Sequence, residues 1–166
     1  MDESELKEKF ISVFEKNIGI ILKISRAFTK TTHDREDLIN DIVLELWKAY
    51  PSFKGDSKVS TWIYRISLNV SMNYKRNKKT SLLFFSDSNQ FDTSTWLQDE
   101  EDNEQTNLLY ECIDELTEFN KALIILYLDG NSHDEISTIT GISKTNVGTR
   151  ISRIKEQIKK IAHKKK

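Results

Sequence analysis

The segment NSHDEISTITGISKTNVGTRISRIKEQIKK carries polar and basic side chains of the kinds that bind nucleic acid. Lysine and arginine donate hydrogen bonds to phosphates and to guanine edges in a major groove, and asparagine and threonine add further donors. On the second helix predicted here they lie opposite an apolar stripe of Val147, Ile151, Ile154 and Ile158. The candidate duplex-binding residues are Lys144, Thr145, Asn146, Thr149, Arg150, Arg153 and Lys155.

The local turn chemistry predicts a helix-turn-helix that would present this face. Ser132 and Glu135 match a capping box that starts a short helix, and Gly141 is suited to the left-handed position that ends it. Ser137 lies four residues before that glycine and Val147 six after, which suits two helices packed tightly across a short turn. The alternative is an ordinary helical hairpin with a solvated polar face.

The segment PSFKGDSKVSTWIYRISLNVSMNYKRNKK forms a second constellation, of aromatic rings, amides and cations. Its predicted helix has an apolar stripe of Ile63, Ile66, Val70 and Tyr74. The remaining side chains suit unstacked bases on a basic path, although a core tryptophan beside a solvated helix end is the better interpretation of this segment alone. The candidates for base contact are Phe53, Lys54, Ser60, Trp62, Arg65, Asn69, Asn73, Lys75 and Arg76.

The predicted helix DREDLINDIVLELWKAY is apolar around most of its circumference. Leu38, Ile42, Leu46 and Ala49 define one stripe, and Ile39, Val43, Leu44 and Trp47 lie outside it. Either the domain packs this helix centrally, or part of it is a partner surface with a polar rim. The candidate partner-binding residues are Asp37, Asn40, Asp41, Leu44 and Lys48.

Composition predicts an all-α chain of two small domains. Only five glycines and one proline interrupt 166 residues, and the 37% hydrophobic content is low for a single core. Residues 5–29 have helical periodicity, Thr32 is a candidate N-cap for the next helix, and Pro51 ends that helix. Periodicity fails after residue 80 and resumes at about residue 107. We therefore expect helical domains at 1–80 and 107–166 and an acidic linker at 81–106.

Charge is distributed unevenly although the formal net charge is only -1. Between Thr80 and Asn120 there are eleven acids and no lysine or arginine. From Gly141 to Lys166, nine basic residues face Glu156 alone, a balance of +8. This asymmetry is typical of a nucleic-acid-binding end beside an acidic connector, although a solvated basic tail is the alternative.

Several classes of function and location are disfavoured. The single Cys112 cannot form an intramolecular disulfide, the start MDESELKEKF lacks a secretory apolar run, and no stretch of about 18 apolar residues appears. His33, Asp34, Glu36 and Asp37 resemble a metal or acid–base cluster less than a helix start. We expect a cytoplasmic protein that is not an enzyme and has no catalytic residue, metal, cofactor or small-molecule substrate.

Taken together, these segments resemble the extracytoplasmic-function group of the sigma-70 family of RNA polymerase sigma factors. DREDLINDIVLELWKAY resembles the family's polymerase-binding helix, FKGDSKVSTWIYRISLNVSMNYKR its minus-ten recognition loop and helix, and the helix-turn-helix its minus-thirty-five reader. The resemblance implies that Asp37, Asn40 and Asp41 bind core polymerase. It also implies that Asn69 and the 53–60 loop hold a flipped base of the melted promoter, while residues 144–153 bind duplex upstream.

The implied partners are core RNA polymerase and promoter DNA, with an anti-sigma factor as a further candidate, and the free chain is expected to be monomeric. Gly148 departs from the family pattern, which often has arginine there, and a close approach to the DNA backbone is one explanation. Ser152 replaces a larger residue. The alternative function is a helix-turn-helix regulator not stably bound to polymerase, but residues 1–79 offer helices where such a regulator needs a sensory domain.

Overall fold

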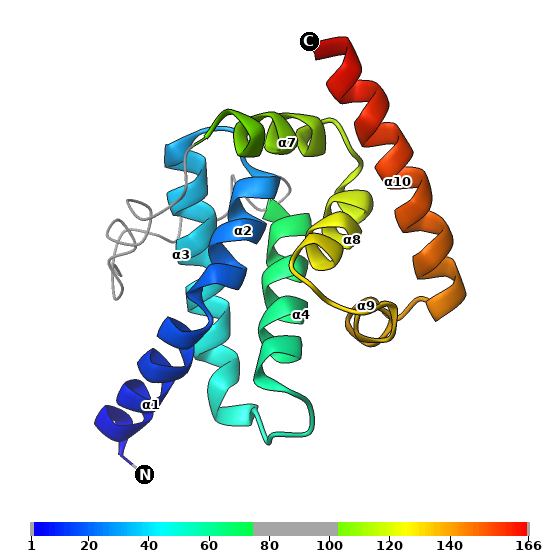
Figure 1. Ribbon diagram of the computed structural model, residues 1–166. Helices are drawn as coiled ribbons and strands as arrows, with labels where there is room; N and C mark the ends of the chain where they lie inside the picture. The colour runs from blue at the N-terminus through cyan, green and yellow to red at the C-terminus, as the bar shows by residue number, and fades with distance from the viewer. Residues whose placement is uncertain (1, 75–102, 166) are drawn as a thin grey trace.

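The computed structural model describes residues 2–74 and 103–165, and within these ranges the regular structure is entirely helical. The first half contains α1 (Glu3–Lys16), α2 (Ile18–Phe28), α3 (Thr32–Ala49), the short 3-10 helix η1 (Tyr50–Ser52) and α4 (Val59–Met72). The second half contains α7 (Glu104–Asp114), α8 (Glu118–Leu128), α9 (His133–Thr140) and α10 (Lys144–Lys165). Figure 1 shows α2, α3 and α4 side by side, with α7 above them and α8–α10 beside α4. No helix in the described ranges could cross a membrane.

The single helix predicted over residues 5–29 is divided in two, which corrects that expectation. Asn17 leaves the helical conformation at φ -118° and ψ 14°, and its side-chain amide donates to the carbonyl of Val13 at 2.9 Å. An asparagine side chain that bonds the local backbone competes with helix continuation. The apolar periodicity continues across the break, because Phe14 and Ile21 are both buried.

The boundaries of α3 agree with the sequence to within about one residue. The N-cap is Thr31, not Thr32, and its hydroxyl accepts a hydrogen bond from the backbone N–H of Asp34 at 3.0 Å. The helix ends at Ala49, and Pro51 lies in the 3-10 turn that follows. Proline disfavours a helical conformation at the preceding residue, which explains this end.

The second half begins earlier than predicted. Asn103 caps α7 by accepting a hydrogen bond from the backbone of Thr106 at 2.8 Å, so residues 104–106 belong to a helix and not to the linker. The rest of the predicted linker lies outside the described residues, as do Lys75 and Arg76. Thr117 caps α8, and Asp129 follows its last turn.

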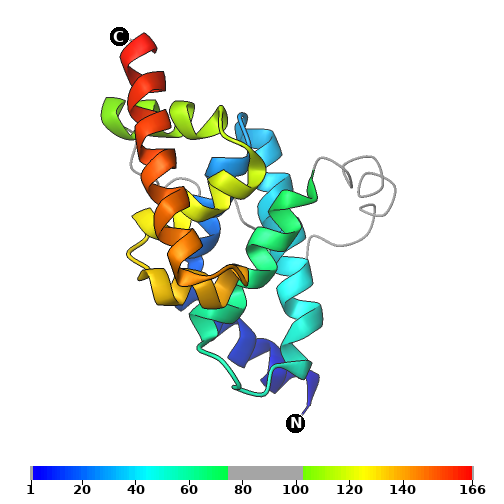
Figure 2. The same cartoon turned by 90° about the vertical axis from the view of Figure 1, so that its right-hand side faces the viewer.

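One continuous hydrophobic core joins the two halves. Its buried members include Ile24 of α2 and Leu68 of α4 together with Leu123 and Ile124 of α8. Both α2 and α4 contact α8, and α4 also contacts α9. The two regions expected to be separate domains are therefore packed together. Figure 2 shows the protein from the side of the second half, with α10 toward the viewer.

Polar contacts surround the apolar part of this seam. Lys30 and Lys121 both approach the carboxylate of Asp114, at 3.2 and 3.7 Å. The guanidinium of Arg26 lies 4.2 Å from the ring centroid of Tyr110 and donates to Asn107 at 2.5 Å. Cations of α2 and of the turn after it thus meet polar groups of α7 across the seam.

The cap of α9 gives a prediction about stability. Replacement of Ser132 by alanine removes the hydroxyl that accepts from the backbone of Glu135 at 3.1 Å, and we expect it to lower the free energy of unfolding by about 1 kcal/mol. Ser152→Ala, at an exposed position inside α10, is the matched control and should change stability by less than about 0.5 kcal/mol. Equal effects in urea denaturation would contradict a capping role for Ser132.

Candidate nucleic-acid interface

The predicted helix-turn-helix is formed by α9 and α10. The capping box of Ser132 and Glu135 is complete, and Gly141 has a left-handed φ of 84°. The hydroxyl of Ser137 donates to the carbonyl of Ile142 at 2.6 Å, so this small residue fastens the turn. Ile136 and Val147 are completely buried between the helices. The residues identified from their spacing around the glycine therefore have the packing roles expected of them.

Most of the candidate duplex-binding side chains are exposed on α10. Lys144, Thr145, Asn146, Thr149, Arg153 and Lys155 belong to this exposed set. Lys144 contacts Asp134 of α9 at 3.3 Å, and Lys155 donates to the hydroxyl of Tyr127 at 2.6 Å. An exposed ion pair such as that of Lys144 contributes little to stability, so this amine is available to another anion.

Arg150 differs from the others because it is half-buried. Its guanidinium lies 5.0 Å from the ring centroid of Phe119 in α8, a cation–π contact. This contact directs the Arg150 side chain toward α8. The sequence pattern did not reveal it, because Phe119 is distant along the chain.

Within the protein, the side chain nearest to Gly148 is that of His133, and the suggested approach of this glycine to a DNA backbone stays a prediction. A Cβ atom at this position would lie 3.5 Å from the ring of His133, the first residue of α9. That distance is an ordinary van der Waals contact, so an alanine has room, whereas a long side chain would have to pass the imidazole. The spacing of the two helices therefore does not by itself require glycine at this position.

The candidate base-binding segment begins with an aromatic cluster. The rings of Phe53 and Trp62 have centroids 4.8 Å apart at an interplanar angle of 32°, and Tyr50 lies 6.2 Å from Trp62. Phe10 of α1 contacts Tyr50 at 5.4 Å. Trp62 is half-buried and packs against the core, as the interpretation of a core tryptophan expected.

Polar candidates of α4 lie farther along the same segment. Arg65 and Asn69 are exposed, and Asn73 donates to the carbonyl of Asn69 at 2.8 Å. Arg65 donates to the carbonyl of Thr138 in α9 at 2.8 Å, so α4 is linked directly to the first helix of the helix-turn-helix. Lys54 is exposed and Ser60 is half-buried.

Most of the apolar circumference of helix α3 is buried in the core, and only a small part of it is left for a partner. Ile39 and Val43, which lie outside the main stripe, are buried together with Leu38, Ile42 and Leu46. Leu44 stays half-buried, and beside it Asp37, Asn40 and Asp41 are also half-buried while Lys48 is exposed. The possible partner surface on this helix is therefore a narrow acidic strip.

The acidic strip has unusual electrostatics. Burial, together with the smaller effect of the neighbouring carboxylates of Asp37 and Glu45, raises the pKa of Asp41 to about 6. Ionised Asp41 is therefore disfavoured in the folded protein. An approaching cation would relieve this repulsion, which makes the strip suited to a basic partner.

No sequence pattern predicted a polar cluster between the halves. The carboxylate of Asp129 accepts hydrogen bonds from the amine of Lys23 at 2.5 Å and from the hydroxyl of Tyr64. Asp129 caps the end of α8, Lys23 belongs to α2 and Tyr64 to α4, so no local spacing relates them.

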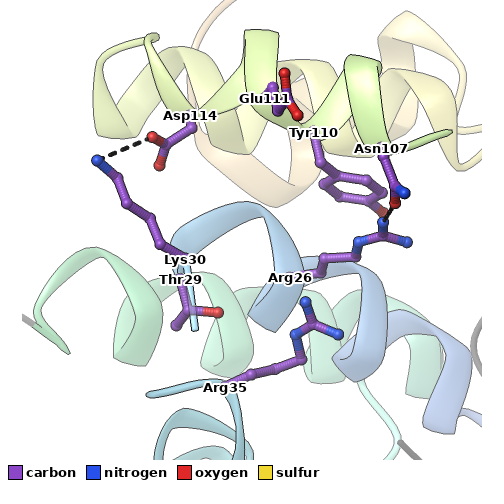
Figure 3. Close-up of a pocket in the computed structure, with 8 residues that line it drawn as sticks. All are labelled: Arg26, Thr29, Lys30, Arg35, Asn107, Tyr110, Glu111 and Asp114. Carbon is purple, nitrogen blue, oxygen red and sulfur yellow. Dashed lines mark hydrogen bonds and ion pairs between the residues drawn. The ribbon is translucent and has the colours of Figure 1, made fainter. Parts of the chain in front are cut away.

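A cavity of about 440 Å³ lies where α7 crosses the first half (Figure 3). Arg26, Lys30 and Arg35 line one side, and the side chains of α7 line the other. Within the described residues, no group of histidine, cysteine and acidic side chains could hold a metal ion.

Asp41 yields a prediction about pH. The folded-state pKa of about 6 exceeds the ordinary 3.8, so this carboxyl's contribution to stability is present below pH 3.8 and is lost as pH rises through 6. Asp41→Asn should therefore stabilise the protein at pH 7 by roughly 1 to 2 kcal/mol, with a smaller gain at pH 4. Asp56→Asn, in an exposed loop, is the control. Urea denaturation at both pH values measures the difference, and an equal gain at both would contradict the assignment.

Family profiles match both halves of the chain. The profile described as Sigma-70 region 2 matches residues 13–80, and the one described as Sigma-70, region 4 matches residues 106–158. The ECF RNA polymerase sigma-E factor of Haemophilus influenzae is 27% identical over 150 residues, which cover 82% of this chain and 79% of that protein. The RNA polymerase sigma-H factor of Pseudomonas aeruginosa is 27% identical over 157 residues, which cover 87% of this chain and 79% of the relative.

Two solved structures share the fold. The chain matches CnrH, solved in complex with the cytosolic domain of CnrY, with a TM-score of 0.67 and 18% identity, over 96% of this chain and 91% of that one. It matches the sigma factor RpoE from Bartonella quintana, solved with the anti-sigma factor NepR, with a TM-score of 0.63 and 19% identity, over 95% and 96% of the two chains. With both regions matched in order on an all-helical fold, this chain belongs to the extracytoplasmic-function group of the sigma-70 family and is a sigma factor for promoter-directed transcription.

Proposed function

We propose that this sigma factor binds core RNA polymerase through the acidic strip of α3, captures a minus-ten base with α4 and its preceding loop, and reads the minus-thirty-five element with α10. The observation that carries the proposal is the pairing of two donor-rich helices, α4 and α10, in one chain whose family acts on promoters. The chain acts by binding and contributes no catalytic residue.

The minus-ten assignment is supported by exposure and by neighbouring groups. Asn69 is exposed on α4 and can offer its amide to the pairing edge of an extruded base. Phe53 and Trp62 supply a stacking surface beside the loop, which suits an unstacked base. Recognition of the base and melting of the duplex then become one step.

The minus-thirty-five assignment is supported by the geometry of α9 and α10. In a helix-turn-helix, residues near the start of the second helix reach base edges, and basic residues farther along contact phosphates. Asn146, Thr149 and Arg150 lie in the first two turns of α10, whereas Lys159 and Lys160 lie beyond them. The first group is therefore assigned to bases and the second to the backbone.

The packed halves must separate for both elements to be read together. The minus-ten and minus-thirty-five elements are roughly 25 base pairs apart, or about 85 Å at about 3.4 Å per step. Arg65 of α4 instead contacts Thr138 of α9 directly. We infer that the described arrangement is a resting conformation and that polymerase and promoter select an open one.

An anti-sigma partner is also proposed. The structural relatives CnrH and RpoE were solved with the cytosolic domain of CnrY and with the anti-sigma factor NepR. A protein that binds only the packed conformation would shift the equilibrium toward it, and would thereby lower the fraction of this chain that can bind polymerase.

The direct test is transcription by core polymerase reconstituted with this chain on genomic promoter fragments. Asp41→Lys should lower the affinity for core by tenfold or more, on the order of 1.4 kcal/mol, because it reverses the charge of the acidic strip. Glu8→Lys, an equal charge reversal on exposed α1, should leave the affinity unchanged. Normal binding by folded Asp41→Lys would show that this strip is not the polymerase surface, and no transcription by the wild type would favour the regulator alternative.

Promoter reading by α10 has its own test. In reconstituted holoenzyme, Arg150→Ala should cost about 1 to 3 kcal/mol on the cognate upstream element and little on a scrambled one. Lys159→Ala should weaken binding to both and reduce the slope of log K against log salt by about one unit. If both variants weaken both sequences by the same factor, α10 is an electrostatic anchor and does not read bases.

A further inference from the structure

The polar cluster around Asp129 joins one anion of the second half to two donors of the first. Asp129 follows α8, and only 11% of its side chain is exposed. Its carboxylate accepts from the amine of Lys23 on α2 at 2.5 Å, and its other oxygen accepts from the hydroxyl of Tyr64 on α4. The donors therefore converge on a single anionic group from different helices.

The Tyr64 hydroxyl is held as a donor. Burial and the hydrogen bond to Asp129 both raise the pKa of the Tyr64 phenol, which favours its protonated form further. The tyrosine is 5% exposed, which holds its ring in one position. Lysine adds a positive charge beside it, and α2 contains no acidic residue from Ile18 to Phe28.

Adjacent contacts across the seam have the same polarity. Arg65, the residue after Tyr64, donates to the carbonyl of Thr138 at 2.8 Å. At both contacts the first half provides donors and the second half provides oxygen acceptors. Lysine, arginine and tyrosine are also among the side chains with which proteins hold DNA phosphates.

We propose that Lys23 and Tyr64 form a phosphate-binding site for promoter DNA, and that the carboxylate of Asp129 occupies this site while the two halves are packed together. A carboxylate and a phosphate each present anionic oxygens that can accept from both donors at once. When the halves separate, the carboxylate leaves and the donors are exposed. Closure of the protein and DNA binding at this site then compete for the same atoms.

Its location favours DNA over another protein as the ligand. Tyr64 belongs to α4, the helix that carries Arg65 and Asn69, so the site continues the proposed minus-ten surface. The proposed polymerase surface lies on α3 and is acidic, with Asp37 and Asp41. This site adds a residue of α2 to the DNA-binding surface, whereas the proposed function uses only α4 and α10. It rests on the proposed function, because α4 must contact promoter DNA.

Two substitutions weaken the same cluster and should have opposite effects. Tyr64→Phe removes the donor and keeps the ring, whereas Asp129→Asn removes the negative charge and leaves a single acceptor oxygen of the same shape. Binding of the free full-length chain to a labelled promoter fragment should become several-fold tighter in Asp129→Asn, because a neutral amide holds the two donors less strongly than the carboxylate does. It should not become tighter in Tyr64→Phe or in Lys23→Gln.

The reconstituted holoenzyme provides the complementary measurement. There the halves are apart, so Asp129→Asn should bind the promoter like the wild type. Tyr64→Phe and Lys23→Gln should bind it several-fold more weakly, and Lys23→Gln should reduce the salt slope by about one unit. Circular dichroism and thermal unfolding confirm that each variant is folded, and Lys23, with 54% of its side chain exposed, tolerates replacement.

Three outcomes would overturn the inference. If Tyr64→Phe and Asp129→Asn tighten DNA binding by the free chain equally and are both neutral in holoenzyme, the cluster only fastens the closed conformation. If Lys23→Gln weakens binding to core polymerase and not to DNA, the ligand is the polymerase. If Asp129→Asn leaves DNA binding by the free chain unchanged, the carboxylate masks nothing. Failure of the wild-type holoenzyme to transcribe would instead count against the proposed function, since DNA binding by the free chain is measured separately.

Discussion

The packing of α2 and α4 against α8 and α9 is the constraint on which the rest of the structure depends. It merges the buried side chains of both halves into one core, so neither half is fully covered without the other. It also brings Arg65 of the proposed minus-ten helix onto α9, next to the proposed duplex reader. Any conformation that reads both promoter elements must therefore replace these contacts with contacts to polymerase or DNA.

The seam combines an apolar centre with polar contacts that water, phosphate or a protein can replace. Lys30 and Lys121 share the carboxylate of Asp114, and Lys23 shares that of Asp129 with Tyr64. Such pairs select a specific register between the halves but contribute modestly to stability where they are exposed. This balance is compatible with the proposed separation of the two halves.

The acidic strip of α3 shows a similar compromise within one helix. Five of its apolar side chains anchor the core, and the polar residues beside them are left half-buried. Burial and two neighbouring acids disfavour the charge on Asp41, which is a local cost to the fold. The polymerase-binding role proposed for this strip would account for such a cost, because binding sites often conflict with stability.

Much of the fold could be predicted from sequence because its signals are local. Pro51 ends α3, the capping box and Gly141 shape the helix-turn-helix, and charge separates the basic α10 from the acidic connector. The break at Asn17 was missed because apolar periodicity continues through it, and the early start of α7 because acidic and polar residues fill its first turn. The helix propensity of a single residue is too weak a signal to locate a helix boundary at such positions.

Tertiary structure alone decided how the two halves meet. Lys23, Tyr64 and Asp129 are separated by long stretches of chain, and periodicity reports only on neighbours within one helix. For the same reason the sequence did not predict the contact between Arg150 and Phe119, or the position of the His133 imidazole beside Gly148. The sequence by itself therefore determined the helices, their caps and the side chains available for binding, whereas the packing of distant helices determined which of those side chains are covered in the closed protein.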